Sequence, residues 1–109
     1  MSDPQESIIV STRWEESRAI IELSGELDLH SSPQLGAAVE DALGRDATAV
    51  EIDAATLSFA DSAGLRALLL ARNDADERGA TLRLTRVSEP LRRLLEMTGL
   101  RETLGVPVT

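Results

Sequence analysis

The chain has 109 residues, enough to bury one modest hydrophobic core, so we expect a single domain over residues 1–109 with a flexible start at residues 1–6. Hydrophobic residues make up 42% and charged residues 28%, close to the averages of globular proteins, which argues against disorder. The net charge is −8 and the 11 basic residues are all arginines scattered without a run, so we expect a protein or small-ligand partner rather than nucleic acid or an anionic membrane.

The chain begins with the pattern of a β-hairpin. Residues 8–10 and 18–23 are apolar runs rich in β-branched side chains, and the polar residues 15–17 separate them. We expect two antiparallel strands joined at this polar turn.

A helix is expected next. Ser31 and Ser32 offer a hydroxyl cap, and Pro33 suits the first helical turn because its φ is fixed and its missing N–H is not needed there. Gly44 is expected to end this helix. Its apolar residues follow helical spacing: Leu35, Val39, Ala42 and Leu43.

The middle of the chain predicts a short strand over residues 49–53 and a helix that begins near Ser62. This helix runs into a polar stretch at residues 74–78, and Gly79 terminates it. One of its faces carries Leu65, Leu68, Leu69 and Arg72.

The last third of the chain repeats the alternation of strand and helix. Residues 81–85 alternate as a strand should. Ser88 and Pro90 indicate the start of a helix, and Gly99 its end. The tail to Val108 is expected to add a short helix or strand. The whole pattern predicts an α/β domain in which helices pack on a small mixed sheet.

The absence of cysteine and the single histidine limit the available chemistry. Without cysteine the chain has no disulfide, no thiolate catalyst and no cysteine-bound metal, and His30 is the one imidazole. The first residues have neither the basic region nor the apolar run of a signal peptide, and no stretch approaches about 18 apolar residues, so the cytoplasm is the expected compartment.

The enzymatic alternative is a serine hydrolase built on Ser62. His30 would be its base, and Asp28 or Asp61 would orient that base. Residues 60–64 lack the first glycine of a nucleophile elbow, and the histidine precedes the serine, against the chain order of that fold. We therefore expect no enzyme.

Metal and nucleotide sites are weakly indicated. Asp28, Asp53 and Asp61 offer oxygen ligands for a hard cation, but their spacing matches no calcium loop. The glycines form neither a dinucleotide fingerprint nor a Walker-type loop. We expect turn and cap roles for the three carboxylates, and no metal or cofactor.

Three segments together resemble the STAS domain family. Residues 25–28 (GELD) precede a predicted helix, residues 59–65 (FADSAGL) contain an aspartate followed by a serine, and residues 88–100 resemble the family's last helix. The family comprises bacterial anti-sigma factor antagonists and relatives in sulfate transporters. The resemblance implies a sheet of four or five strands flanked by four or so helices.

The resemblance also implies partner switching in the control of transcription, as in stress responses. In such antagonists the serine after the motif's aspartate, here Ser62, is unphosphorylated when the protein binds an anti-sigma factor and frees a sigma factor. The anti-sigma factor is often a serine kinase of the histidine-kinase-like ATPase type, and a serine phosphatase is expected to reverse the modification. Many members carry Ser or Thr next, where this chain has Ala63. The implied partner-binding residues are Asp28, Asp61, Ser62, Ala63, Gly64, Leu65 and Arg66.

Ser62 has two compatible interpretations, a helix cap worth about 1 kcal/mol and a switch. A phosphate at a helix N-terminus gains about 0.3–2 kcal/mol. Repulsion from Asp61, about 6 Å away, is of similar size. The fold should therefore survive phosphorylation, whereas a phosphate buried in an interface without a counter-charge should abolish binding.

Two alternatives stay open. Leu65 is expected in the core, although partial exposure beside Arg66 would make it an apolar contact for a partner. The competing function is a constitutive STAS subunit of a lipid-trafficking ABC transporter complex, because some of those small proteins also resemble residues 61–65 (DSAGL).

Overall fold

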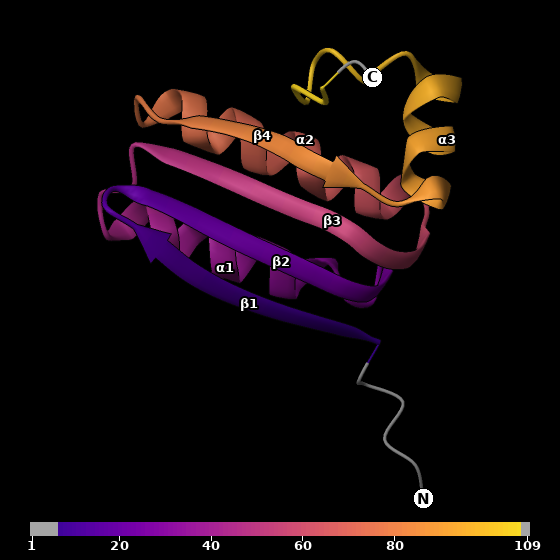
Figure 1. The fold of residues 1–109 in the computed structure, drawn as a ribbon, viewed down its shortest axis with the longest axis horizontal. Helices are drawn as coiled ribbons and strands as arrows, with labels where there is room; N and C mark the ends of the chain where they lie inside the picture. Colours follow the sequence, from indigo (N-terminus) through magenta and orange to yellow (C-terminus); the bar gives the residue numbers. More distant parts are fainter. Residues whose placement is uncertain (1–6, 108–109) are drawn as a thin grey trace, which may run out of the picture.

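A computed structural model describes residues 7–107, so the expected flexible start at residues 1–6 lies outside the described residues. Within that range a four-stranded sheet carries three helices (Figure 1). In chain order the elements are β1 (Ile8–Glu15), β2 (Arg18–Leu27), α1 (Ser32–Gly44), β3 (Ala49–Ala60), α2 (Ser62–Glu77), β4 (Thr81–Val87) and α3 (Glu89–Thr98). The α/β class is confirmed, with three helices in this range rather than four or so.

The sheet is mixed, with the order β1-β2-β3-β4. β1 and β2 form the predicted antiparallel hairpin, whose turn places Glu16 at a φ of 58°. β2, β3 and β4 are parallel, and α1 and α2 make the connections between them. In Figure 1 both helices lie behind the sheet, and α3 lies at the end where β3 and β4 finish. The carboxyl ends of the three parallel strands therefore share one edge of the domain.

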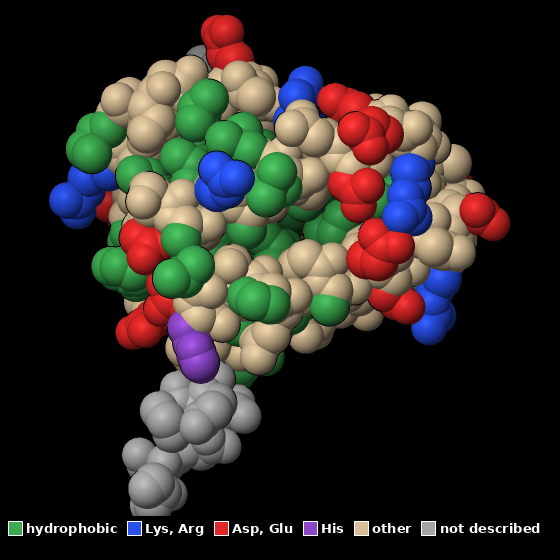
Figure 2. Space-filling view, turned by 180° about the vertical axis from the view of Figure 1, so that it is seen from behind, with side chains coloured by type: hydrophobic (Ala, Val, Ile, Leu, Met, Phe, Trp, Pro, Cys, Tyr) green, Lys and Arg blue, Asp and Glu red, His purple; other side chains and the backbone are tan. Residues whose placement is uncertain are grey.

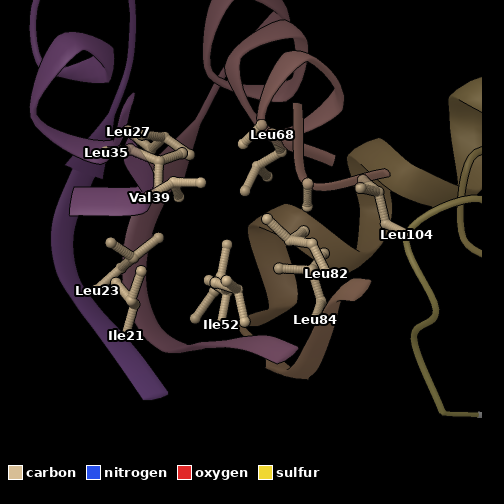
Figure 3. Close-up of a cluster of buried hydrophobic side chains, with 14 of the residues drawn as sticks. Ile21, Leu23, Leu27, Leu35, Val39, Ile52, Leu68, Leu82, Leu84 and Leu104 are labelled. Atoms are coloured by element: carbon tan, nitrogen blue, oxygen red, sulfur yellow. The ribbon is translucent and has the colours of Figure 1, made fainter. Parts of the chain in front are cut away.

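The core lies between the sheet and these helices. Along β3, Val50, Ile52 and Ala54 are buried, while Glu51 and Asp53 alternate with them toward the opposite face. Figure 3 shows leucine, isoleucine and valine side chains from several strands and helices converging on one another. The apolar residues predicted on the first helix are all buried: Leu35, Val39, Ala42 and Leu43.

The opposite face of the sheet is polar and carries charged pairs between strands. Arg18 of β2 donates to Glu51 of β3 at 2.9 Å, and Arg86 of β4 donates to Asp53 of β3 at 3.2 Å. Because the arginine of each pair is exposed to solvent, screening keeps the contribution of each pair to stability small, about 0–1 kcal/mol. These charged pairs lie on the face of the sheet opposite the core, as expected for a sheet that buries one face only.

All four strands extend beyond the runs that the sequence pattern indicates, and the tail differs. The pattern placed strands at residues 18–23 and 49–53, but β2 continues to Leu27 and β3 to Ala60. The pairing of these extensions is irregular, and register shifts near Glu22–Glu26 break the simple alternation on which the prediction depended. The tail forms turns over residues 101–105 instead of a helix or strand.

Two helix boundaries were predicted well. The Ser88 hydroxyl accepts a hydrogen bond from the Leu91 N–H at 3.4 Å and caps α3, as expected. Gly99 ends the same helix in the left-handed conformation, with a φ of 73°.

Candidate partner-binding site

Two of the sequence-predicted carboxylates meet because neighbouring parallel strands end together. Leu27 of β2 pairs with Ala60 of β3, and Asp28 and Asp61 are the next residues of the two strands. With Leu29 and His30 they line a shallow concavity at the carboxyl edge of the sheet. The long-range pairing of β2 and β3 thus assembles residues that are 33 positions apart in the chain.

Asp61, not Ser62, caps α2. Asp61 has extended backbone angles (φ −119°, ψ −174°), and its Oδ1 accepts the Gly64 N–H at 2.9 Å. Its backbone carbonyl accepts the Leu65 N–H at 2.9 Å. The cap predicted for the serine is therefore wrong, because Ser62 is the first helical residue, one position after the extended residue whose side chain reaches back to the free N–H groups.

The Ser62 side chain is exposed at the first position of α2. Among residues 7–107 no hydrogen bond engages its hydroxyl. Ala63 is half-buried next to it, and Arg66 is exposed one turn further along the helix. These residues form an accessible stretch beside the concavity.

The next two residues of the motif face inward. A Cβ on Gly64 would lie 2.5 Å from the carbonyl oxygen of Leu27, so only glycine lets α2 approach the end of β2 this closely. Leu65 is 4% exposed and belongs to the core. The partial exposure considered for Leu65 is therefore not found, and both residues pack beneath the accessible stretch.

Hydrogen bonds within the loop between β2 and α1 hold the carboxylate of Asp28 in place. Asp28 Oδ1 accepts the Ser31 N–H at 2.9 Å, and the Asp28 N–H donates to Ser31 Oγ at 3.0 Å. That hydroxyl also donates to the Glu26 carbonyl at 2.7 Å. The hydrogen bond from the Ser31 N–H is the main cause that lowers the pKa of Asp28, because it favours the charged carboxylate.

Ser31 therefore has a different role from the one predicted. It precedes α1 at the N-cap position but makes no side-chain cap, because its hydroxyl is committed to the loop. Ser31 is 1% exposed, which makes this short network a buried support of the concavity.

Two exposed apolar residues at this edge were missed by the sequence analysis. Leu29 is 76% exposed in the loop after β2, and Phe59 is 46% exposed near the end of β3. Phe59 lies two residues after the buried Leu57, so simple alternation would bury it, whereas the irregular pairing turns it outward. The only indication in the sequence that Leu29 is exposed is its predicted position in a loop.

A second apolar surface lies between the two helices. Figure 2 shows the helix face of the molecule, where apolar side chains gather around a hollow. The groove between α1 and α2 is lined on one side by Pro33 and Gly36, and on the other by Ala67, Leu70 and Ala71. Leu70 is 54% exposed, so this surface continues from the exposed start of α2 along the helix.

The three aspartates considered as metal ligands are not brought together. Asp53 lies away from the concavity, on the polar face of the sheet beside Arg86, so the three aspartates do not converge. Among the described residues no group of three or more His, Asp or Glu side chains is placed to hold a metal ion. No helix within residues 7–107 is long and apolar enough to cross a membrane.

A family model described as the Mlab, STAS domain matches residues 10–106. The chain belongs to the STAS domain family. The resemblance of its three motif segments to that family is thereby confirmed, and the STAS match extends over nearly the whole chain.

Individual proteins similar to this chain include anti-sigma factor antagonists. An anti-sigma F factor antagonist of Paenibacillus polymyxa is 33% identical over 88 residues, which cover 80% of this chain and 75% of that protein. Solved structures with the same fold include an anti-sigma factor antagonist from Mycobacterium paratuberculosis, at 24% identity, with a TM-score of 0.83 and coverage of 100% of this chain and 92% of the other. The Bacillus protein SpoIIAA in its phosphorylated form is 24% identical, with a TM-score of 0.70 and 92% of each chain covered.

Proposed function

We propose that this STAS domain is an anti-sigma factor antagonist that binds an anti-sigma factor when Ser62 is unphosphorylated and thereby frees a sigma factor. The observation that carries this proposal is the exposed hydroxyl at the first residue of α2, beside the concavity of Asp28 and Asp61. The antagonist named among the relatives supports the same role. Binding rather than catalysis is the proposed activity, with no cofactor and in the cytoplasm.

Phosphorylation of Ser62 is proposed to end binding. A partner kinase would transfer the γ-phosphoryl group of ATP to Ser62 Oγ, which loses its proton as ADP leaves. The added charge of about −1.5 to −2 would have to be stripped of water in the interface, at a cost that lowers affinity tenfold for each 1.4 kcal/mol. A phosphatase would restore binding.

The fold itself is expected to tolerate the phosphate. Ser62 is exposed, and its side chain takes no part in the cap that Asp61 provides to Gly64. SpoIIAA, whose fold is shared by this chain, has been solved in a phosphorylated form. These points support a switch in binding without a change in architecture.

The proposed contact surface consists of accessible residues with two supports beneath them. Its accessible residues are Asp28, Asp61, Ser62, Ala63 and Arg66, flanked by the exposed Leu29 and Phe59. Gly64 and Leu65 position this surface from the interior. The expected partner is an anti-sigma factor of the histidine-kinase-like ATPase type, which acts as the serine kinase.

Two observations favour a second candidate function. The matching family model carries the description Mlab, and the motif has Ala63 where many antagonists have a second hydroxyl. A constitutive STAS subunit of a lipid-trafficking ABC transporter complex is therefore the alternative. It predicts a stable ATPase partner whose binding is indifferent to the state of Ser62.

The test is intact-mass spectrometry of the purified protein after incubation with ATP and extract of its own host. We expect one added phosphate that is lost in Ser62→Ala and kept in Ser58→Ala, a matched change at another exposed serine. Affinity purification from the same extract should recover an anti-sigma factor with the unmodified form alone. Absence of the phosphate, together with recovery of a transporter ATPase, would replace the antagonist role with the second candidate.

A further inference from the structure

Arg66 is unusual among the arginines of this acidic chain. Among residues 7–107, eight arginines lie within 4.0 Å of a carboxylate oxygen, and Arg66, Arg83 and Arg101 do not. Arg101 donates to the Pro107 carbonyl at 3.3 Å, and Arg83 of β4 packs against Gly105, so both side chains contact the C-terminal turns. Arg66 alone of the three lies on the helix that carries Ser62.

The helix geometry directs Arg66 toward Ser62. The two residues are four positions apart and both exposed on α2, so their Cβ atoms lie about 5–6 Å apart on one face. Side chains of a helix lean toward its N-terminus, which brings the guanidinium back over the serine. An anion that precedes a cation by four residues is also the order that the helix dipole favours.

The neighbouring carboxylates leave this guanidinium available. Asp61 is engaged by the Gly64 N–H at 2.9 Å, and Asp28 by the Ser31 N–H at 2.9 Å. Among the ion pairs of residues 7–107, none joins either carboxylate to Arg66. An arginine outside these ion pairs therefore lies four residues after the exposed Ser62, near a concavity that carries the carboxylates of Asp28 and Asp61.

We infer that Arg66 is the counter-ion of a phosphate on Ser62, and that in the unmodified protein the same guanidinium binds a carboxylate of the anti-sigma factor. This inference rests on the proposed function, because it assigns the regulation of that site. An arginine buried in an interface needs an anionic acceptor, and its planar guanidinium binds a carboxylate or a phosphate in two-point fashion. Phosphorylation would then weaken binding in two ways. The Arg66 guanidinium would pair with the phosphate instead of the partner's carboxylate, and the phosphate would repel that carboxylate.

The phosphate half of the inference is tested without any partner. Phosphoserine is installed at position 62 during translation, and the second pKa of the phosphate, normally about 6, is measured by phosphorus NMR. We expect this pKa to be higher in Arg66→Gln than in the unsubstituted protein by about 0.5 or more, because a cation about 6 Å away favours the dianion. Raising the salt concentration to 1 M should shrink the difference.

Arg72→Gln is the matched control. It removes the same charge from the same helix about 9 Å further along the axis, from an arginine already paired with Asp76 at 3.6 Å. The control should leave the phosphate pKa near that of the unsubstituted protein. Equal pKa values in Arg66→Gln and the unsubstituted protein, or equal rises in both variants, would overturn the pairing.

The partner half is tested by titrating the anti-sigma factor with the unmodified proteins. Arg66→Gln should bind at least about tenfold more weakly, the fold-change typical of a lost charge-assisted contact, while Arg72→Gln binds normally. Unchanged affinity in Arg66→Gln overturns this half. If the unsubstituted protein binds no anti-sigma factor, the proposed function fails, and the phosphorus NMR result still decides the pairing on its own.

Discussion

The glycines of the two family motifs are fixed by different constraints. Gly25 has a φ of +106°, and a Cβ there would lie 2.3 Å from the Ser7 carbonyl, which already accepts the Glu26 N–H at 2.6 Å. Gly64 has an ordinary helical backbone and is constrained by the carbonyl and the side chain of Leu27. Part of what makes these motifs recognisable is therefore close packing around the site rather than contact with a partner.

Gly64→Ala should destabilise the protein by about 1–3 kcal/mol, because the added Cβ meets rigid backbone at 2.5 Å. Gly36→Ala in α1 is the control, since a Cβ there meets nothing within 4 Å and alanine favours a helix by about 0.5–1 kcal/mol. Urea unfolding of both variants measures the difference. A neutral or stabilising Gly64→Ala would show that α2 does not need this close approach.

The Asp28 carboxylate should make stability depend on pH in the acidic range. Its pKa is lowered in the folded state by the hydrogen bond from the Ser31 N–H, so its stabilising contribution is present above the unfolded pKa of about 3.9 and is lost as pH falls through the lower folded pKa. Urea unfolding between about pH 2 and 6 should show a steeper loss in the unsubstituted protein than in Asp28→Asn. Parallel curves would contradict this contribution.

At the scale of single side chains, the sequence predicted where Ser62 lies but not its bonding. Periodicity placed it at the start of a helix, which the structure confirms. Whether Asp61 or Ser62 caps that helix depends on which residue holds extended backbone angles, and that is decided by where β3 ends. Neighbouring residues that are both good caps cannot be ranked by pattern alone.

Two elements begin with the same local sequence, a serine followed two residues later by proline, and they are held differently. Ser88 caps α3 through the Leu91 N–H, whereas Ser31 precedes α1 and binds the Glu26 carbonyl and the Asp28 N–H. The difference arises because the loop before α1 must turn sharply away from β2, leaving backbone groups that need a partner.

Ser31→Ala should therefore cost about 1–3 kcal/mol, because it leaves a carbonyl and an N–H of the loop without their partner. Ser88→Ala, the matched loss of a cap, should cost about 1 kcal/mol. Thermal unfolding of the two variants gives the comparison. If Ser31→Ala is no more destabilising than the loss of an exposed hydroxyl, water replaces it in the loop.

The strands show where sequence periodicity stops being informative. Residues 81–85 alternate cleanly and were found within β4, but the ends of β2 and β3 were missed. Those ends contain Gly25 and a shift in register, so polar and apolar residues no longer alternate along them. The exposure of Phe59, and with it part of the candidate surface, depends on this irregular stretch.

At the scale of the whole molecule, one core between the sheet and its helices should unfold as a unit. Trp14 is 37% exposed on β1, at the edge of the sheet, whereas the three helices bury residues in the core. Fluorescence of this single tryptophan and far-UV circular dichroism should report the same urea midpoint, with a slope of about 1–3 kcal/mol per molar urea. An earlier fluorescence transition would show that β1 detaches first.

The site as a whole was not deducible from local pattern. Its concavity exists because Leu27 and Ala60 pair across two parallel strands, and no local signal in the chain specifies that register. The family resemblance supplied the grouping of Asp28 with Ser62 that periodicity did not. The α/β class, by contrast, followed from the alternation of strands and helices alone.

The turns that follow α3 limit strand pairing between copies of this chain. The Leu84 N–H of β4 donates to the carbonyl of Leu104, whose side chain is fully buried, so these turns occupy the outer side of the last strand. A chain truncated after Thr98 would keep every strand and helix. It would, however, expose the backbone hydrogen-bonding groups on the outer edge of β4. Such a fragment would be prone to strand addition and aggregation. The irregular segment after α3 therefore protects the edge strand β4 and is a structural part of the domain.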